Sequence, residues 1–240
     1  MPDDFPVPDL DAVLSQAIPF DKNRWIPLLP DATWWPPELN DCPRVARWPR
    51  VDRRTVFSIA CRAGTAETNR HLLVAALVWG TGTKARGVQR RGQIFAHISA
   101  AEFDARLGAA LTALREKGAA EAYWALNNDH KIPHLGPAFF TKVLYFAGGG
   151  AVPGPHRPLI LDSFVSSVLK ELELVDERWP DSGWKTNQYR QYLGVVHDLA
   201  RQRSVRPDQI EVALFRRSKH KVLLDRTGTR KCRTGSASAW

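Results

Sequence analysis

Apolar residues recur every three or four positions along most of the chain after residue 52, and this spacing is the period of α-helices. The segment 99–118 shows it most clearly. Its apolar positions are separated by four, four and three residues: Phe103, Leu107, Leu111 and Leu114. Ser99 and Glu102 form a capping-box pattern at the start, and Gly118 is a typical stop. The segment therefore predicts a helix between Ser99 and Gly118.

Similar patterns predict further helices, whereas no run of alternating polar and apolar residues predicts a sheet. The expected helices cover residues 10–17, 68–79, 119–126, 137–147, 163–172, 185–202 and 207–217, with Gly80 as the end of the second. The first 50 residues are rich in Pro and Trp, and they predict an extended wrap whose aromatic side chains pin it to the core. The expected fold class is all-α.

The chain has 240 residues, of which 44% are hydrophobic and 25% charged, as in a globular protein with a sizeable core. We expect residues 1–225 to form one domain and the basic residues 226–240 to be a disordered tail. No apolar run has the length of a membrane span, and the first residues do not resemble a signal peptide. The expected location is the cytoplasm, away from the membrane.

The three cysteines, Cys42, Cys61 and Cys232, are scattered along the chain. This spacing argues against a disulfide framework, a zinc site and a four-cysteine iron–sulfur cluster. The net charge of +9 suits a polyanionic partner. Basic residues gather in two places: Lys84, Arg86, Arg90 and Arg91, and then Arg216, Arg217, Lys219, His220 and Lys221. Each cluster is either a DNA-binding patch or a solvated surface.

Residues 131–147 carry the most informative motif. A glycine turn at residues 132–137 predicts a short hairpin, and Pro137 suits the first position of the helix that follows. Backbone N–H groups at such a turn bind a DNA phosphate without reading sequence. The candidate contacts with the DNA backbone are His134, Gly136, Ala138, Lys84 and Arg86. A capping or surface role is the alternative for His134.

Two charged residues near this motif are candidates for chemistry. Lys142 lies among apolar residues of the predicted helix, where desolvation favours a neutral, nucleophilic amine. The alternative is a lysine that reaches out to solvent or to a phosphate. Asp162 follows the apolar run 159–161 as the predicted N-cap of a helix, whose dipole favours the ionised carboxylate. The alternative is an aspartate that only caps.

Hairpin, lysine and aspartate in this order resemble the helix-hairpin-helix DNA glycosylases, in particular the lysine-bearing branch that includes the 8-oxoguanine glycosylases. In that branch the lysine and the aspartate stand roughly twenty residues apart, and here the separation is 162 − 142 = 20. The run Thr141-Lys142-Val143 fits the same branch. The turn Trp79-Gly-Thr-Gly82 resembles that of its short bacterial members. The resemblance covers roughly residues 56–215.

The resemblance implies a two-lobed fold with a cleft, in which residues 131–147 form the helix-hairpin-helix core. It implies that the bacterial protein, a monomer without metal or cofactor, flips a modified base out of double-stranded DNA and excises it. Asp162 would stabilise positive charge on the sugar, and Lys142 would be the nucleophile of a glycosylase with possible lyase activity. Four residues would line the base pocket: Trp79, Gly80, Gly82 and Tyr145. The alternative for Trp79 is a core residue at the end of a helix. Residues 210–215 are expected to form a core helix without chemistry.

Two departures from the family leave the excised base open. Residues 137–140 precede Thr-Lys-Val as an addition relative to the 8-oxoguanine enzymes, and the large β-containing N-terminal region of the eukaryotic enzymes is missing. Short bacterial members are associated with defence against phages, so a bulky modified cytosine of phage DNA is one expected substrate and 8-oxoguanine is the other.

The rival function is a non-catalytic helix-hairpin-helix DNA-binding module, in which Lys142 and Asp162 need not converge. A protein-interaction domain would leave the basic excess unexplained.

Overall fold

The computed structural model describes residues 5–232, and the side chains of residues 5–219. Within this range the fold is all-α, as predicted, with one small sheet. The helices are α1 (Leu10–Leu14), α2 (Lys22–Trp25), α3 (Arg53–Ala60), α4 (Ala66–Thr81), α5 (Ala85–Ala96), α6 (Ala100–Lys117), α7 (Ala119–Asn127), α8 (Pro137–Ala147), α9 (Ser163–Glu171), α10 (Thr186–Gln202) and α11 (Pro207–Cys232). None of these helices is both long and apolar enough to cross a membrane.

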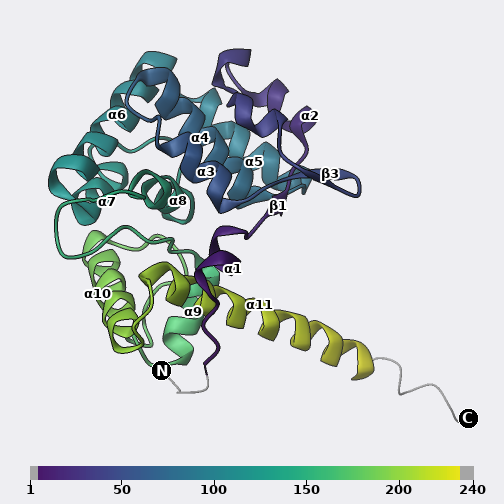
Figure 1. Ribbon diagram of the computed structural model, residues 1–240, viewed down its shortest axis with the longest axis vertical. Coiled ribbons are helices and arrows are strands. Elements are labelled where there is room, and N and C mark those ends of the chain that lie inside the picture. Colours follow the sequence, from purple (N-terminus) through teal and green to yellow (C-terminus); the bar gives the residue numbers. More distant parts are fainter. Residues whose placement is uncertain (1–4, 233–240) are drawn as a thin grey trace, which may run out of the picture.

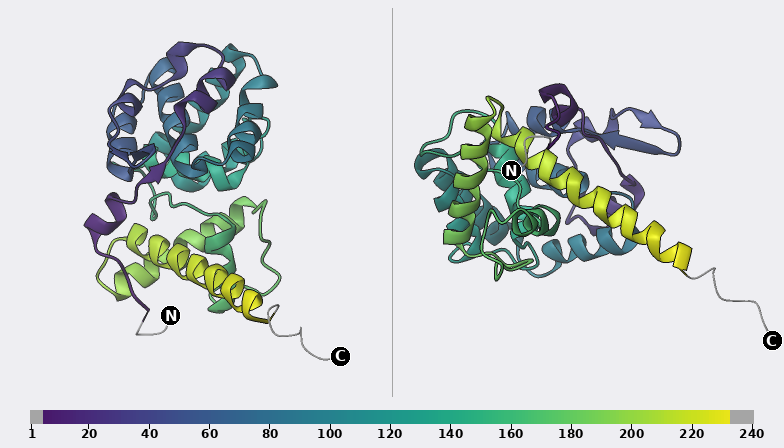
Figure 2. Two further views of the ribbon diagram at one scale, coloured as in Figure 1. Left: turned by 90° about the vertical axis from the view of Figure 1, so that its right-hand side faces the viewer. Right: turned by 90° about the horizontal axis from the view of Figure 1, so that it is seen from below.

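The helices lie in two groups in space. Figures 1 and 2 show α2–α8 gathered at one end of the molecule and α9–α11 at the other, with the segment between α8 and α9 passing from one group to the other. One cluster of buried apolar residues has members in both groups, such as Leu77 of α4, Val143 of α8 and Leu193 of α10. The description as two lobes with a cleft between them stays a prediction.

The first 50 residues are more structured than the expected wrap. They contain three 3₁₀ helices, Ile26–Leu28, Ala32–Trp34 and Pro37–Asn40, and the strands β1 (Ile18–Pro19), β2 (Arg44–Val45) and β3 (Trp48–Val51). The strands form an antiparallel sheet in the order β1-β3-β2, in which Ile18 pairs with Val51. Strands of two to four residues are too short to show alternation, which explains why the sequence pattern did not predict the sheet. Trp25 and Trp34 are fully buried, as expected of aromatic side chains that pin this segment to the core.

The predicted ends of two helices need correction. Helix α4 passes through Gly80 and ends at Thr81, because its C-cap Gly82 adopts a positive φ (73°) that glycine permits. Helix α11 passes Arg217 and continues to Cys232, so residues 226–232 of the predicted disordered tail are helical. No proline follows Pro207 in the chain, and Lys, Arg and Leu favour helix. Residues 233–240 of the predicted tail lie outside the described residues.

Candidate active site

The segment before α9 brings Asp162 next to α8. The amide of Leu161 donates a hydrogen bond to Thr141 Oγ1 (3.2 Å), and both residues are buried. Two tyrosines of α10 hold the same segment, since the hydroxyl of Tyr192 donates to the Ile160 carbonyl (2.6 Å) and that of Tyr189 to the Leu159 carbonyl (3.0 Å). Because Thr141 bonds to Leu161, the neighbouring residues Lys142 and Asp162 also meet.

Asp162 uses its two carboxylate oxygens for different contacts. Oδ1 accepts from the backbone amides of Phe164 (3.1 Å) and Val165 (3.2 Å), so Asp162 is the N-cap of α9 as predicted. Oδ2 lies 3.4 Å from Nζ of Lys142. The amides and the helix dipole favour a negative charge here, while Oδ2 is directed to the lysine. The cap and the ion pair therefore coexist in one side chain.

Lys142 is nearly buried, with 7% of its side chain exposed. Its Nζ donates to the carbonyl of Ala138 (2.7 Å), one helical turn earlier, and lies 5.3 Å from the ring centroid of Phe139. The ammonium thus stays inside the molecule, beside Asp162. The side chain therefore does not extend into bulk solvent, which was the alternative expected from the sequence.

Lys142 and Asp162 line one cavity of about 480 Å³, within the range typical of small-molecule sites. Its other walls come from α3, α4, α11 and the segments around β1 and before α5. Further lining residues are Gln16, Ile18, Pro19, Arg53, Trp79, Gly80, Thr81, Gly82, Thr83, Lys84, Ile160, Phe164, Glu211, Phe215 and Lys219. The rings of Phe164 and Phe215 meet edge to face, with centroids 5.5 Å apart. The cavity therefore combines a lysine–carboxylate pair with aromatic surfaces on which a planar group can stack.

Three of the four predicted base-pocket residues line this cavity: Trp79, Gly80 and Gly82. Gly80 also makes room for the lysine. A Cβ atom at position 80 would stand 2.8 Å from Cδ of Lys142 and 3.1 Å from a ring carbon of Phe139. A side chain here would push the lysine away from its present position. Trp79 is 5% exposed, so it is both a cavity residue and a core residue.

Gly80→Ala is expected to lower the activity of the site while preserving the fold. The added methyl group displaces the Lys142 side chain, and a misplacement of about 1 Å at a reacting group costs up to about 100-fold in rate. We expect at least a roughly tenfold slower single-turnover reaction. Gly64→Ala is the matched control, because a Cβ atom at Gly64 would meet nothing within 4 Å. Equal rates for the two variants would contradict the role given to Gly80.

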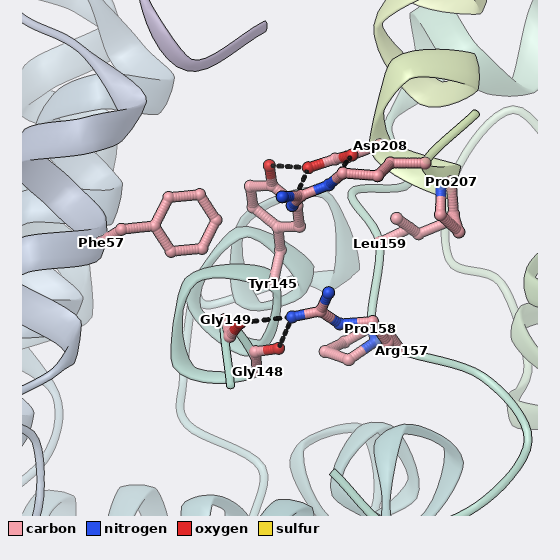
Figure 3. A pocket seen from close by; sticks show the side chains of 10 residues that line it. Phe57, Tyr145, Gly148, Gly149, Arg157, Pro158, Leu159, Pro207 and Asp208 are labelled. Atoms are coloured by element: carbon pink, nitrogen blue, oxygen red, sulfur yellow. Dashed lines mark hydrogen bonds and ion pairs between the residues drawn. The ribbon is translucent and has the colours of Figure 1, made fainter. Parts of the chain in front are cut away.

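Tyr145, the fourth predicted base-pocket residue, lies outside the cavity. Its ring packs against Phe57, with centroids 5.2 Å apart, and its hydroxyl donates to Asp208 Oδ2 (3.2 Å). Figure 3 shows it lining a separate, small pocket with Asp208 and Arg157. That pocket has a volume of about 20 Å³, enough for about one water molecule. Tyr145 is thus enclosed between α3 and α11, with its ring against Phe57 and its hydroxyl turned toward Asp208.

Sequence reasoning missed a buried charged pair in the cavity wall. Arg53 of α3 and Glu211 of α11 form an ion pair (2.9 Å), and both are about 99% buried. Burial disfavours the charged guanidinium, yet the facing Glu211 carboxylate keeps the pKa of Arg53 above its ordinary value. Burial also raises the pKa of Glu211, an effect that Arg53 opposes. The sequence offers one signal for this pair, since Glu211 is a charge within the otherwise apolar run 210–215, which predicts a core helix without chemistry.

The predicted hairpin residues lie beside a second cavity. Gly136 is the N-cap of α8 with Pro137 in the first turn, as predicted. His134 has a positive φ of 60°, is exposed, and lies against His97 with the two rings tilted and their centroids 4.8 Å apart. With Ala138 these residues line a cavity of about 450 Å³, to which Arg90, Arg91 and Lys131 add positive charge. The arrangement offers backbone amides and cations to an anion.

The two remaining candidates for DNA contact are exposed residues at the start of α5. Lys84 is the residue before the helix and lines the cavity of Lys142 and Asp162, whereas Arg86 lines neither of the two cavities. Within the described residues, no group of three or more His, Cys, Asp or Glu side chains could hold a metal ion. The cavity of Lys142 and Asp162 offers an amine, a carboxylate and hydrogen-bonding groups around a space with aromatic walls.

Comparison with known proteins identifies one family. A family model described as “Putative 8-oxoguanine DNA glycosylase OGG-like protein” matches residues 11–215, which include Lys142, Asp162 and the hairpin. No curated protein and no solved structure matches the chain. The match agrees with the resemblance inferred from the hairpin, the lysine and the aspartate.

Proposed function

Since the chain belongs to this OGG-like family of DNA glycosylases, we propose that it flips a modified base out of double-stranded DNA and excises it, leaving an abasic site. The family supports a DNA substrate and glycosylase chemistry.

The observation that carries the proposal is the convergence of Lys142 and Asp162. Their charged atoms lie 3.4 Å apart and both residues line one cavity, although twenty positions separate them in the chain. A non-catalytic DNA-binding module needs the hairpin and the positive charge, but it has no use for a nearly buried lysine opposite a carboxylate. An amine and a carboxylate that converge on one cavity are candidates for a nucleophile and a charge-stabilising group. The arrangement therefore favours an enzyme over a binding module.

In the proposed reaction, Lys142 first loses one proton of its ammonium to solvent, and the neutral Nζ then forms a bond to C1′ of the flipped nucleotide as the C1′–N bond breaks. The electron pair of that bond leaves with the base. Asp162 stabilises the positive charge that develops on the sugar and accepts a proton from the amine. Opening of the C1′–O4′ bond then gives a Schiff base, so the two amine protons end on the departing base and on O4′. Hydrolysis of the Schiff base leaves an abasic site, and elimination of the 3′-phosphate would make the enzyme a lyase as well.

In this proposal, the hairpin binds the sugar–phosphate backbone of the DNA. The N-terminus of α8, from Gly136 to Ala138, is positioned to bind a phosphate through backbone amides, with Arg90, Arg91 and Lys131 close by. Such contacts hold DNA of any sequence and fix its register on the protein. We propose that a monomer binds duplex DNA in this way, with the flipped base in the cavity of Lys142.

We propose a bulky modified cytosine as the base, and restriction of phages whose DNA carries it as the role. The volume of about 480 Å³ fits a drug-sized ligand. The second candidate is 8-oxoguanine, because the description of the matching family names it. A site for 8-oxoguanine must distinguish one oxygen and one N–H from guanine, which requires a tight pocket.

We expect duplexes with glucosylated 5-hydroxymethylcytosine to release their base faster than duplexes with 8-oxoguanine. The physical reason is the size of the cavity that Lys142 and Asp162 line, about 480 Å³, in which a bulky substituent finds room. The measurement is the free base, quantified by mass spectrometry after incubation with duplexes that differ in one nucleotide. Plain cytosine is the control. Efficient release of 8-oxoguanine, with none of the modified cytosine, would reverse the assignment.

A further inference from the structure

Gln16 lies between α1 and β1, and two contacts fix it at the edge of the cavity that holds Lys142 and Asp162. Its side-chain Oε1 accepts from Nε of Arg53 (3.0 Å), and its backbone carbonyl accepts from the indole N–H of Trp79 (3.1 Å). Its side chain is partly exposed, whereas Arg53 is buried. The amide group is therefore held in place without being enclosed.

The contact with Arg53 determines which end of the amide is available. A guanidinium only donates, so Gln16 must present its oxygen to Arg53 and its nitrogen elsewhere. Within the described part of the chain, Nε2 of Gln16 has no hydrogen-bond partner. This atom is not fully buried, so a molecule in the cavity can reach it. Two N–H groups thus remain for a molecule in the cavity.

Arg53 is itself immobilised, so the orientation of Gln16 is built into the fold. Glu211 pairs with Arg53 at 2.9 Å, and the rings of Trp79 and Tyr145 each lie 4.9 Å from the guanidinium carbon. An ion pair that is about 99% buried carries a large desolvation cost and is weak evidence for stability. A role in orienting Gln16 explains its presence in the cavity wall.

We infer that Gln16 is a specificity-determining residue that donates a hydrogen bond to an acceptor on the flipped base, with Arg53 and Glu211 as positioning residues. Enzymes that flip a base read its Watson–Crick edge by hydrogen bonds. The acceptors on that edge of a cytosine are N3 and O2, whether or not C5 carries a substituent. The inference rests on the proposed function, because it names the contact that the same cavity makes with its substrate.

The test compares two variants that separate the contact with the base from the contact with Arg53. Gln16→Glu keeps an oxygen for Arg53 but has no N–H, whereas Gln16→Leu lacks both. The probes are a duplex with 2′-fluoro-5-hydroxymethylcytidine, whose fluorine opposes the sugar cation and so prevents cleavage, and the same duplex with a tetrahydrofuran abasic site. The readout is the ratio of the two affinities, which a purely structural role of Gln16 leaves unchanged.

We expect wild-type protein to prefer the duplex that carries the base, and both variants to lose about tenfold of this preference, as for one hydrogen bond. Their affinity for the abasic duplex should stay within about twofold of wild type. An unchanged preference in Gln16→Glu, or no preference in wild type, would overturn the inference. If these results come with normal base release by wild-type protein, the proposed function stands and only the role of Gln16 fails.

Discussion

Asp162→Asn is expected to lower base excision by two or more orders of magnitude. The substitution removes the negative charge beside the site where the sugar becomes positive, and a 100-fold loss corresponds to about 3 kcal/mol of transition-state stabilisation. Asparagine is as good an N-cap as aspartate, so the contacts with the amides of Phe164 and Val165 can persist. The measurement is the single-turnover rate of base release, together with the affinity for an abasic duplex, which should be largely unchanged.

The matched control is Asp9→Asn. Asp9 caps α1 by accepting from the amide of Ala12 (2.6 Å), and it does not line the cavity. If capping were all that mattered, the two variants would behave alike. Base release close to the wild-type rate by Asp162→Asn would exclude Asp162 as a catalytic residue.

Lys142→Gln is expected to abolish both turnover and the covalent intermediate. If the amine attacks C1′, borohydride reduces the Schiff base and traps a protein–DNA adduct in the wild-type protein. Lys142→Arg keeps a positive charge beside Asp162 but cannot form the Schiff base, so it too should give no adduct. The measurement is the amount of adduct on a denaturing gel, with the rate of base release measured in parallel.

Lys170→Gln is the matched control. Lys170 also forms an ion pair with an aspartate, Asp181, but it lies away from the cavity, so this variant shows the effect of losing such a pair elsewhere. It should give normal adduct. If Lys142→Gln still releases bases and the wild-type protein gives no adduct, water is the nucleophile. Lys142 would then only orient the DNA or the carboxylate.

Much of the helical fold could be predicted because its signals are local. The cap at Ser99, the stop at Gly118, the proline of the first turn of α8 and the cap at Asp162 each depend on residues within one turn. Gly80 misled for a physical reason, because glycine is compatible with a helix interior and only the backbone of Gly82 ends α4. The short strands before residue 52 have too few residues to show a period.

The site could be predicted only in part, because most of its contacts are non-local. Lys142 and Asp162 were found from one motif and its spacing, and their meeting depends on a bond between Thr141 and Leu161 that no local pattern encodes. Arg53 and Glu211 are 158 positions apart (211 − 53), so no local pattern predicts their pairing, although Glu211 stands out as a charge among apolar residues. Gln16 had no signal at all, since its role comes from that pair.

We propose that this chain cuts the bond between a modified base and its sugar with the site of Lys142 and Asp162. The most direct measurement is the release of free base from DNA of a phage with glucosylated 5-hydroxymethylcytosine, by wild-type protein and by Asp162→Asn, under single-turnover conditions. We expect the wild-type protein to release the modified base into solution. The rate of this release should be at least about 100-fold lower with Asp162→Asn. The contradicting result is that the protein binds this DNA but releases no base from it, nor from duplexes with other modified bases such as 8-oxoguanine. The protein would then be a non-catalytic DNA-binding module.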